Sequence, residues 1–189
     1  MYNEIRAEQF ARTTNQQFHM YLAVDKVEKQ RVMGNLRLCL SRVHSKESRE
    51  SLGRLPLLPG MPVLINENLC ISSKVVHSSE GILTDVIYKS TTEGREALCA
   101  FVKVPSLLLD LEGLEPFVIL VFPRTTQFSY RTVTRESIKI SCMQLPLLPA
   151  WGFMDYKVQG TSMKKVIIDL ASARGVQNAY VMLSRVTSL

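Results

Sequence analysis

The chain has 189 residues, of which 46% are hydrophobic and 21% charged, and 23 lysines and arginines against 17 acidic residues give a net charge of +6. This composition excludes a disordered tail, a collagen-like repeat and a small disulfide-stapled scaffold. A polyanionic partner such as nucleic acid is compatible with the basic charge but is not required by it.

The first fifty residues favour helices. Residues 3–19 form one predicted helix, which Asn3 can cap and whose broad face collects Ile5, Phe10, Ala11 and Phe18. From residue 21 to residue 50 the sequence is charged and compatible with helix, with apolar side chains spaced by four at Val32, Leu36 and Leu40. Gly34 counts against a helix there, because glycine is a poor helix former.

The pattern changes at residues 55–65, LPLLPGMPVLI, where three prolines break helices and indicate extended chain. Strand-sized apolar segments follow at 63–65, 82–88, 98–104 and 117–122, with polar turns between them. Short strands at this spacing predict a small antiparallel β-barrel. LPLLP returns at 145–149, and we interpret the two copies as approximate borders of an inserted module.

A basic stretch near the end of these strands has two interpretations. Its cations, Arg124, Arg131, Arg135 and Lys139, alternate with the aromatic residues Phe128 and Tyr130. Aromatic rings among cations are typical of surfaces on which bases stack. A solvated protein face is the commoner origin of such a stretch, and the sequence leaves both open.

The last segment predicts a strand at 166–170, which contains the carboxylate of Asp169, followed by a helix at 177–186. A continuous apolar strand that ends in a carboxylate is typical of a parallel sheet covered on both faces. A strand and a helix that follow an earlier helix indicate an α/β fold.

Several familiar sites are missing from the sequence. The four cysteines, at 39, 70, 99 and 142, form no C-x-x-C pair, so we expect reduced, mostly buried thiols and no metal site. The longest uncharged run, 140–154, has fifteen residues and two prolines, too short to span a membrane, so we expect no membrane partner. No G-x-x-x-x-G-K-S/T segment occurs, and no Asp-Glu pair follows an apolar strand, so a self-sufficient ATP-hydrolysing enzyme is not expected.

The last forty residues carry a specific resemblance. Residues 155–160 read D-Y-K-V-Q-G, a strand ending in Asp follows at 166–170, and Q-N-A-Y-V-M-L-S-R-V occupies 177–186. In this order they resemble the C-terminal end of the petite-integration-frequency DNA helicases, in the superfamily-1 group with RecD, and especially the copies carried by Helitron transposons. Residues 3–25, 55–69 and 80–88 also resemble the family, so the likeness covers nearly the whole chain.

The resemblance implies a fold and a set of functional residues. Residues 1–54 and 143–189 would form part of the second RecA-like domain, an α/β fold, and residues 55–142 an inserted Src-homology-3-like antiparallel β-barrel. Arg185 matches an arginine finger, a guanidinium that stabilises the transferring phosphoryl group of ATP. Gln159 and Gly160 match the loop nearest the nucleotide, and Tyr156 and Lys157 match a motif that lies along the DNA.

Other interpretations of single residues remain. Arg185 taken alone would be a surface cation of a helix, and the surrounding motif favours the finger. Tyr156, which stands where many cellular members have His, is as compatible with packing as with DNA contact. Trp151 is expected in the core, and Asp169 is expected to close a strand. Cys142 and Met143 replace a basic pair that often precedes the second LPLLP phrase.

The full family uses ATP and Mg²⁺ to unwind duplex DNA in the 5′ to 3′ direction, in DNA repair and recombination. We expect this chain alone to bind neither cofactor and to need a first RecA-like domain, supplied in cis or in trans. Single-stranded or forked DNA is the expected partner, and the expected location is intracellular, in the nucleus or alternatively the mitochondrion. The alternatives are a non-enzymatic module that binds single-stranded nucleic acid and a decayed transposon remnant.

Overall fold

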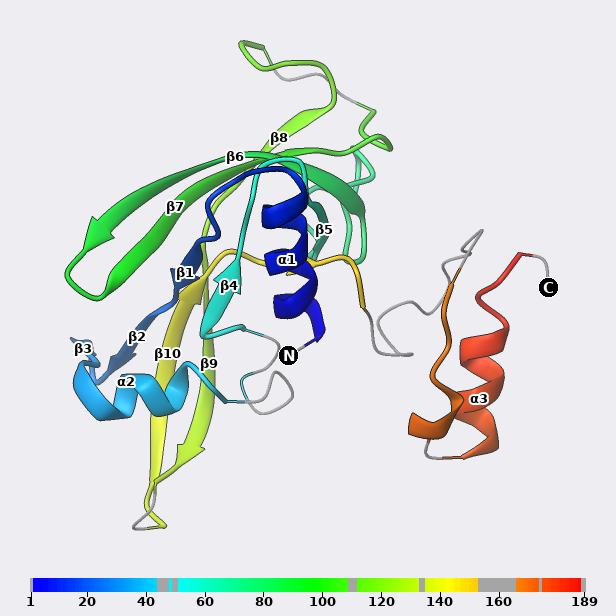
Figure 1. The fold of residues 1–189 in the computed structure, drawn as a ribbon. Coiled ribbons are helices and arrows are strands. Elements are labelled where there is room, and N and C mark those ends of the chain that lie inside the picture. Colours follow the sequence, from blue (N-terminus) through cyan, green and yellow to red (C-terminus); the bar gives the residue numbers. More distant parts are fainter. Residues whose placement is uncertain are drawn as a thin grey trace. The chain divides into compact units, whose positions relative to one another are not determined.

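The computed structural model describes residues 2–43, 48, 51–108, 112–132, 135–152, 166–173 and 175–187. The chain divides into two compact units, Met1–Trp151 and Gly152–Leu189 (Figure 1). The predicted borders after residues 54 and 142 stay a prediction. In the first unit, however, a strand from the first fifty-four residues joins the same sheet as strands of the predicted insertion.

Helix α1 spans Tyr2–Thr13 and is six residues shorter at its C-terminal end than the predicted helix 3–19. Asn15 has a left-handed φ of 53°, and the backbone N–H groups of Asn15 and Gln16 donate to the carbonyls of Arg12 and Ala11. These two bonds close the C-terminus in a Schellman motif. The helix buries Ala7 and Ala11, whereas Ile5 is exposed, so small side chains let α1 pack closely on the sheet.

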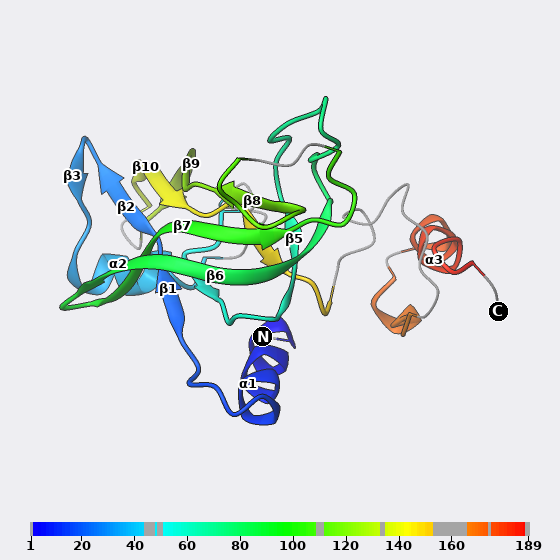
Figure 2. The same cartoon turned by 90° about the horizontal axis from the view of Figure 1, so that it is seen from above.

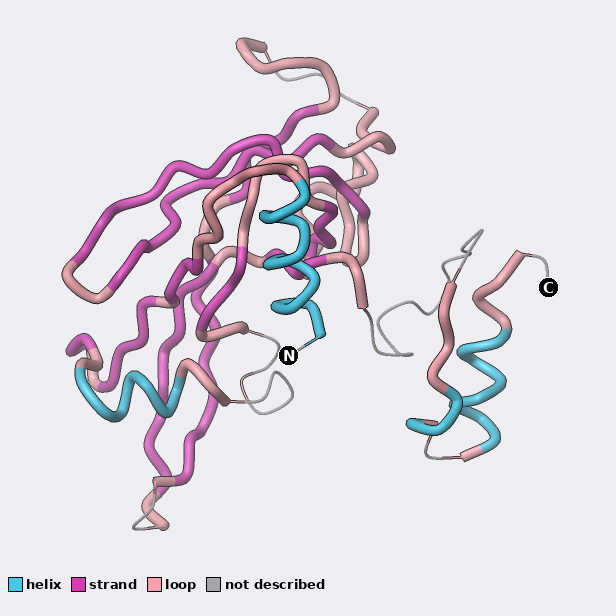
Figure 3. The backbone as a smooth tube through the Cα atoms, viewed as in Figure 1, coloured by secondary structure: helices cyan, strands magenta, loops and turns pink. Residues whose placement is uncertain are grey.

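Residues 20–31 form strands, so the helix-compatible interpretation of 21–50 is wrong there (Figure 3). The strands are β1 (Met20–Leu22), β2 (Val24–Val27) and β3 (Gln30–Arg31), and the short helix α2 (Gly34–Leu40) follows. The β2–β3 turn consists of Glu28 and Lys29, both with positive φ. Such a turn usually contains Asn or Gly, so its residues carried no turn signal.

The larger sheet has seven strands, six of them in the order β11-β5-β6-β7-β1-β4. Strand β1 pairs with the beginning of β7, at Arg95, and the seventh strand, β8, pairs with residues 100–103 of β7. All its pairings are antiparallel except that of β1 with β7. The remaining strands are β4 (Arg54–Pro56), β5 (Pro62–Ile65), β6 (Glu80–Thr91), β7 (Gly94–Lys103), β8 (Val118–Val121) and β11 (Leu147–Pro149). The four predicted strand segments therefore coincide with β5, β6, β7 and β8.

The two LPLLP phrases contribute the strands at the two edges of this sheet, β4 and β11. Proline lacks an N–H donor and is tolerated at edges, which explains its position. The leucines fill the first core cluster; those buried to 1% exposure or less are Leu55, Leu57, Leu58 and Leu147. Trp151 packs against this cluster, with its ring 5.7 Å from that of Phe10, as expected for a core residue.

The smaller sheet has four strands in the order β3-β2-β10-β9, with β9 at Arg124–Arg131 and β10 at Ser137–Gln144. Its inner face forms a second core cluster that contains Ala23, Val32, Leu40, Phe128, Ile140 and Cys142. Alternate residues of β9 and β10 point the other way, as the two-residue period of a strand requires. The basic stretch therefore has one apolar face and one polar face.

In the second unit, residues 166–169 form no strand and Leu170–Ser172 form a 3-10 helix, so the predicted strand 166–170 is wrong. The Asp169 side chain accepts a hydrogen bond from the Ala171 N–H at 3.2 Å and caps this short helix, rather than closing a strand. The predicted helix 177–186 is present as α3 (Val176–Leu183). No helix within the described ranges is long and apolar enough to cross a membrane.

Candidate functional site

The residues predicted from the helicase resemblance are divided by the structure into two sets. Tyr156, Lys157, Gln159 and Gly160 lie outside the described residues, and Arg185 lies within them. The structure therefore gives the local geometry of the predicted finger, while all five roles stay predictions.

Arg185 follows the C-terminal end of α3 and lies back along that helix. Its Nε donates to the Val181 carbonyl at 3.1 Å, and its Nη2 donates to the Ser184 hydroxyl at 2.9 Å. The side chain is half-buried. A cation at a helix C-terminus is favoured by the helix dipole, so sequence and helix together orient this guanidinium.

Helix α3 itself has no buried residue among those described, although it is strongly apolar. Val176 is 87% exposed and Tyr180 71%. A helix with this many apolar residues normally buries one face against a neighbour.

The outer face of the smaller sheet is basic. Lys26 of β2, Arg131 of β9 and Lys139 of β10 are all exposed, and the register places Ser129, opposite Lys139, and Gln127, opposite Ser141, on the same face. We call these five residues the basic face. Phe128 and Tyr130, which the sequence suggested as stacking partners for bases, belong to the opposite side: Phe128 is 6% exposed, and Tyr130 packs against the second core cluster. Of the two interpretations of the basic stretch, base stacking is therefore wrong for Phe128, because strand alternation directs its ring into the core.

A second candidate surface could not be recognised in the sequence. A groove of about 300 Å³ is formed by the segment before β1, the loop after β4, and the β6–β7 hairpin. We call it the aromatic groove; it is lined by residues that include Gln17, His19, Tyr21, Asp85, Tyr88 and Arg95. No motif signals it, because its members are separated by about seventy positions in the chain.

Burial sets the protonation of two groove residues. It lowers the pKa of His19, and the neighbouring Arg95 cation lowers it further, so His19 is neutral at pH 7. Burial also raises the pKa of the Tyr21 hydroxyl, which accordingly stays protonated. The groove thus contains hydrogen-bonding groups and one fixed cation.

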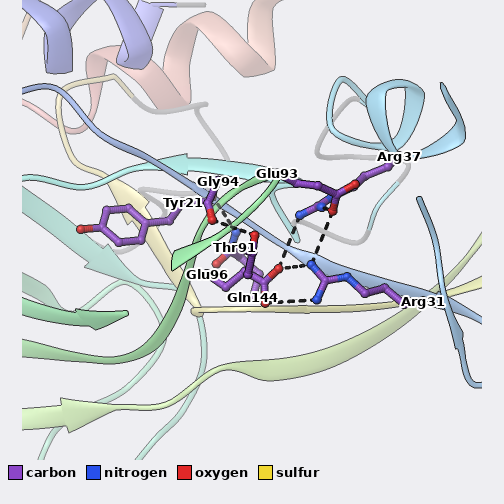
Figure 4. Close-up of polar contacts among 8 residues, drawn as sticks. All are labelled: Tyr21, Arg31, Arg37, Thr91, Glu93, Gly94, Glu96 and Gln144. Carbon is purple, nitrogen blue, oxygen red and sulfur yellow. Dashed lines mark hydrogen bonds and ion pairs between the residues drawn. The ribbon is translucent and has the colours of Figure 1, made fainter. Parts of the chain in front are cut away.

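An ion cluster fastens the tip of the β6–β7 hairpin to β3 and α2 (Figures 2 and 4). Arg37 of α2 pairs with Glu93 and lies 3.7 Å from Glu96, while Arg31 of β3 pairs with Glu96 and lies 3.6 Å from Glu93. Burial lowers the pKa of Arg37 below its usual value. This cluster holds the hairpin that carries Tyr88 and Arg95.

The cysteines and acids offer no evident metal centre. In the part of the chain that the structure describes, no three His, Cys, Asp or Glu side chains are grouped to hold a metal ion. Cys99 and Cys142 are buried as predicted, whereas Cys39 and Cys70 are exposed.

Comparison with known proteins gives the fold. No family model and no curated protein sequence matches the chain. Among solved structures, the Candida albicans Pif1 helicase matches with a TM-score of 0.57 and 20% identity, over 99% of this chain and 41% of that one. A Bacteroides Pif1 helicase in complex with ADP-AlF3 and single-stranded DNA matches with a TM-score of 0.57 and 19% identity, over 100% of this chain and 37% of that one. The chain has the fold of a Pif1 helicase segment.

The Pif1 likeness confirms, at the level of the fold, the resemblance to petite-integration-frequency helicases that the motifs predicted. The unliganded Bacteroides Pif1 also matches, with a TM-score of 0.52 and 21% identity. The chain spans less than half the length of each of these Pif1 structures. A closer relation to the Helitron-borne helicases stays a prediction.

Proposed function

We propose that the chain is the C-terminal part of an ATP-dependent DNA helicase that moves 5′ to 3′. Residues 1–54 and 143–189 would contribute to its second RecA-like domain, and residues 55–142 would form the Src-homology-3-like insertion. The observation that supports this most is the Pif1 fold match over the full chain, to a protein crystallised with ADP-AlF3 and single-stranded DNA.

The proposed chemistry assigns this chain a supporting role in ATP hydrolysis. Negative charge spreads over the transferring phosphoryl oxygens, and a guanidinium can contact two of them at once. Arg185 would supply that contact from the end of α3, with Gln159 and Gly160 near the nucleotide and with Tyr156 and Lys157 on the DNA. ATP and Mg²⁺ would be held mainly by a P-loop domain, which this sequence does not contain.

Trans-complementation tests the proposal. The purified chain alone should show no DNA-stimulated ATP turnover. Addition of a separately expressed first RecA-like domain from the Bacteroides Pif1 helicase should produce turnover, and Arg185→Ala should reduce it by about a thousandfold, the range for removal of an arginine finger. Arg185→Lys should fail to restore it, because a lysine cannot make the bidentate contact.

The control is Arg12→Ala, which removes an exposed cation of α1 and should leave the complemented turnover unchanged. Turnover by the chain alone, lost in Arg185→Ala, would contradict the need for a second domain. Complemented turnover that is indifferent to Arg185→Ala would refute the finger assignment.

A second candidate function is non-enzymatic binding of single-stranded nucleic acid, and the basic face favours it. Three exposed cations from three adjacent strands, with no acidic side chain in the same strand rows, suit a phosphate backbone. Affinity for single-stranded DNA should fall as the salt concentration rises. Lys139→Ala should reduce the magnitude of the slope of log affinity against log salt concentration by about 0.7. Lys103→Ala, an exposed cation of β7, is the control; equal slopes for both variants would remove this candidate.

A further inference from the structure

The aromatic groove has a construction that neither the Pif1 likeness nor the predicted motifs explain. It lies within the first unit and is built by residues 16–21, 57–59 and 85–95. None of these residues belongs to the predicted finger, nucleotide or DNA motifs.

The Arg95 cation packs against an aromatic ring in this groove. The Arg95 guanidinium carbon lies 4.3 Å from the centre of the Tyr88 ring, and Arg95 is close enough to the Tyr21 hydroxyl to offset part of the rise in its pKa. Tyr21 in turn packs edge-on against Tyr88, with ring centres 5.7 Å apart and planes at 76°. Cation–π and edge-to-face contacts of this kind restrict the positions of the three side chains before any ligand arrives.

The surroundings of this stack are accessible and include polar groups among the apolar ones. Tyr88 is 39% exposed, and the Asp85 carboxylate, which accepts the Val86 N–H at 2.7 Å, lies along the same groove wall. Gln17 is exposed beside the opening, and His19 adds a neutral ring. An immobilised guanidinium plane offers one face for stacking, and the amide and carboxylate offer acceptors and donors for the edge of a planar heterocycle.

We propose that the aromatic groove binds one unpaired base of a single-stranded nucleic acid. The base stacks on the Arg95 guanidinium, Gln17 and Asp85 contact its hydrogen-bonding edge, and the adjoining phosphate stays outside near the Arg95 N–H groups. The Asp85 carboxylate repels phosphate from the groove wall, which sets this orientation. Stacking of bases on arginine planes and aromatic rings is a general mode of single-strand recognition.

The inference shares its ligand class with the second candidate function but uses a different surface. The experiment therefore compares groove variants with basic-face variants in the same full-length chain. Fluorescence anisotropy measures binding to an oligonucleotide of about twelve thymidines, to the same backbone without bases, and to the matching uridine RNA. Thymidine monophosphate serves as a competitor.

Arg95→Lys keeps the charge and removes the stacking plane. It should weaken binding of the thymidine oligonucleotide about tenfold, within the range for one stacked base, and should leave binding of the abasic backbone within about twofold. Lys89→Ala, an exposed cation of β6 that does not line the groove, should leave both unchanged. Equal losses for the two oligonucleotides, or no loss for either, would overturn the proposal.

Two further results separate the alternatives. If thymidine monophosphate competes as tightly as the oligonucleotide binds, the groove takes a free nucleotide and the single-strand proposal is wrong. If only Lys139→Ala weakens binding, the basic face is the nucleic-acid surface and the groove is not. A 5-iodouracil oligonucleotide should cross-link at Tyr88 or Tyr21 of the unmodified chain, and cross-links confined to β9 and β10 would again reject the groove.

Discussion

Arg37 provides the sharpest test of how the first unit is held together. Its side chain is only 8% exposed and faces two carboxylates, Glu93 at 24% and Glu96 at 9% exposure. Both Arg37 Nη atoms face these two carboxylates, so ionic attraction is its main contact. Arg37→Met fills much of the same volume but removes the charge.

The expected loss follows from the charges that remain. Removing one partner of a buried ion pair typically costs about 3–5 kcal/mol, because the other charge is left uncompensated. Here Arg31 still neutralises Glu96, and Glu93 reaches solvent, so we expect Arg37→Met to lower the free energy of unfolding by about 2–3 kcal/mol. Arg31→Met should cost less than about 1 kcal/mol, because its side chain is 34% exposed.

Urea unfolding followed by Trp151 fluorescence measures these differences. The chain has one tryptophan, and it packs against the first core cluster, so its emission reports on the first unit. The double variant Arg37→Met with Glu93→Gln should recover at least about 1 kcal/mol, because the uncompensated carboxylate is gone. The reasoning would be refuted if the stability of Arg37→Met lay within about 0.5 kcal/mol of wild type. It would also be refuted if Arg31→Met were less stable than Arg37→Met.

Three further predictions concern single residues. Hydrogen bonds with the Ser72 and Ser73 side chains lower the pKa of the Cys70 thiol to about 7, whereas burial raises the pKa of the Cys142 thiol to about 12. Iodoacetamide should therefore label Cys70 with a midpoint near pH 7 and spare Cys142 in the folded chain; equal labelling by mass spectrometry would contradict this. A Cβ at Gly81 would lie 2.5 Å from Val102 Cγ1, so Gly81→Ala should cost about 1–3 kcal/mol in urea unfolding, and a neutral result would show that the sheet yields there. Burial raises the pKa of Asp25, so the folded chain binds this proton more tightly than the unfolded chain. The free energy of unfolding should therefore fall as pH rises through the folded pKa. Asp25→Asn should flatten that dependence above about pH 4, which unfolding at several pH values would detect.

Much of the secondary structure of the first unit could be predicted from the sequence. Apolar runs bounded by polar turns located β5 to β8, because a strand that buries a face needs apolar residues wherever it faces the core. The prolines of the LPLLP phrases indicated extended chain, and the structure places both phrases at sheet edges where a missing N–H costs least. The ordered motifs at 155–186 indicated the helicase resemblance, and the comparison with Pif1 structures confirms it for the fold.

Other features required the tertiary structure. Glu28 and Lys29 are ordinary helix formers, and the antiparallel pairing of β2 with β3 makes them the turn of a hairpin instead. The direction of Phe128 depends on strand register, since a shift of one residue exchanges its core and solvent faces.

The sequence by itself determined local preferences, which located the strand segments and the terminal helices. The order of its motifs along the chain determined the likeness to helicases. Only the tertiary structure decided which distant side chains meet, as in the Arg37 ion cluster and the stack of Tyr21, Tyr88 and Arg95. The physical reason is that periodicity and turn chemistry act between near neighbours, whereas a groove or an ion cluster arises from sheet pairing between segments that the sequence keeps far apart.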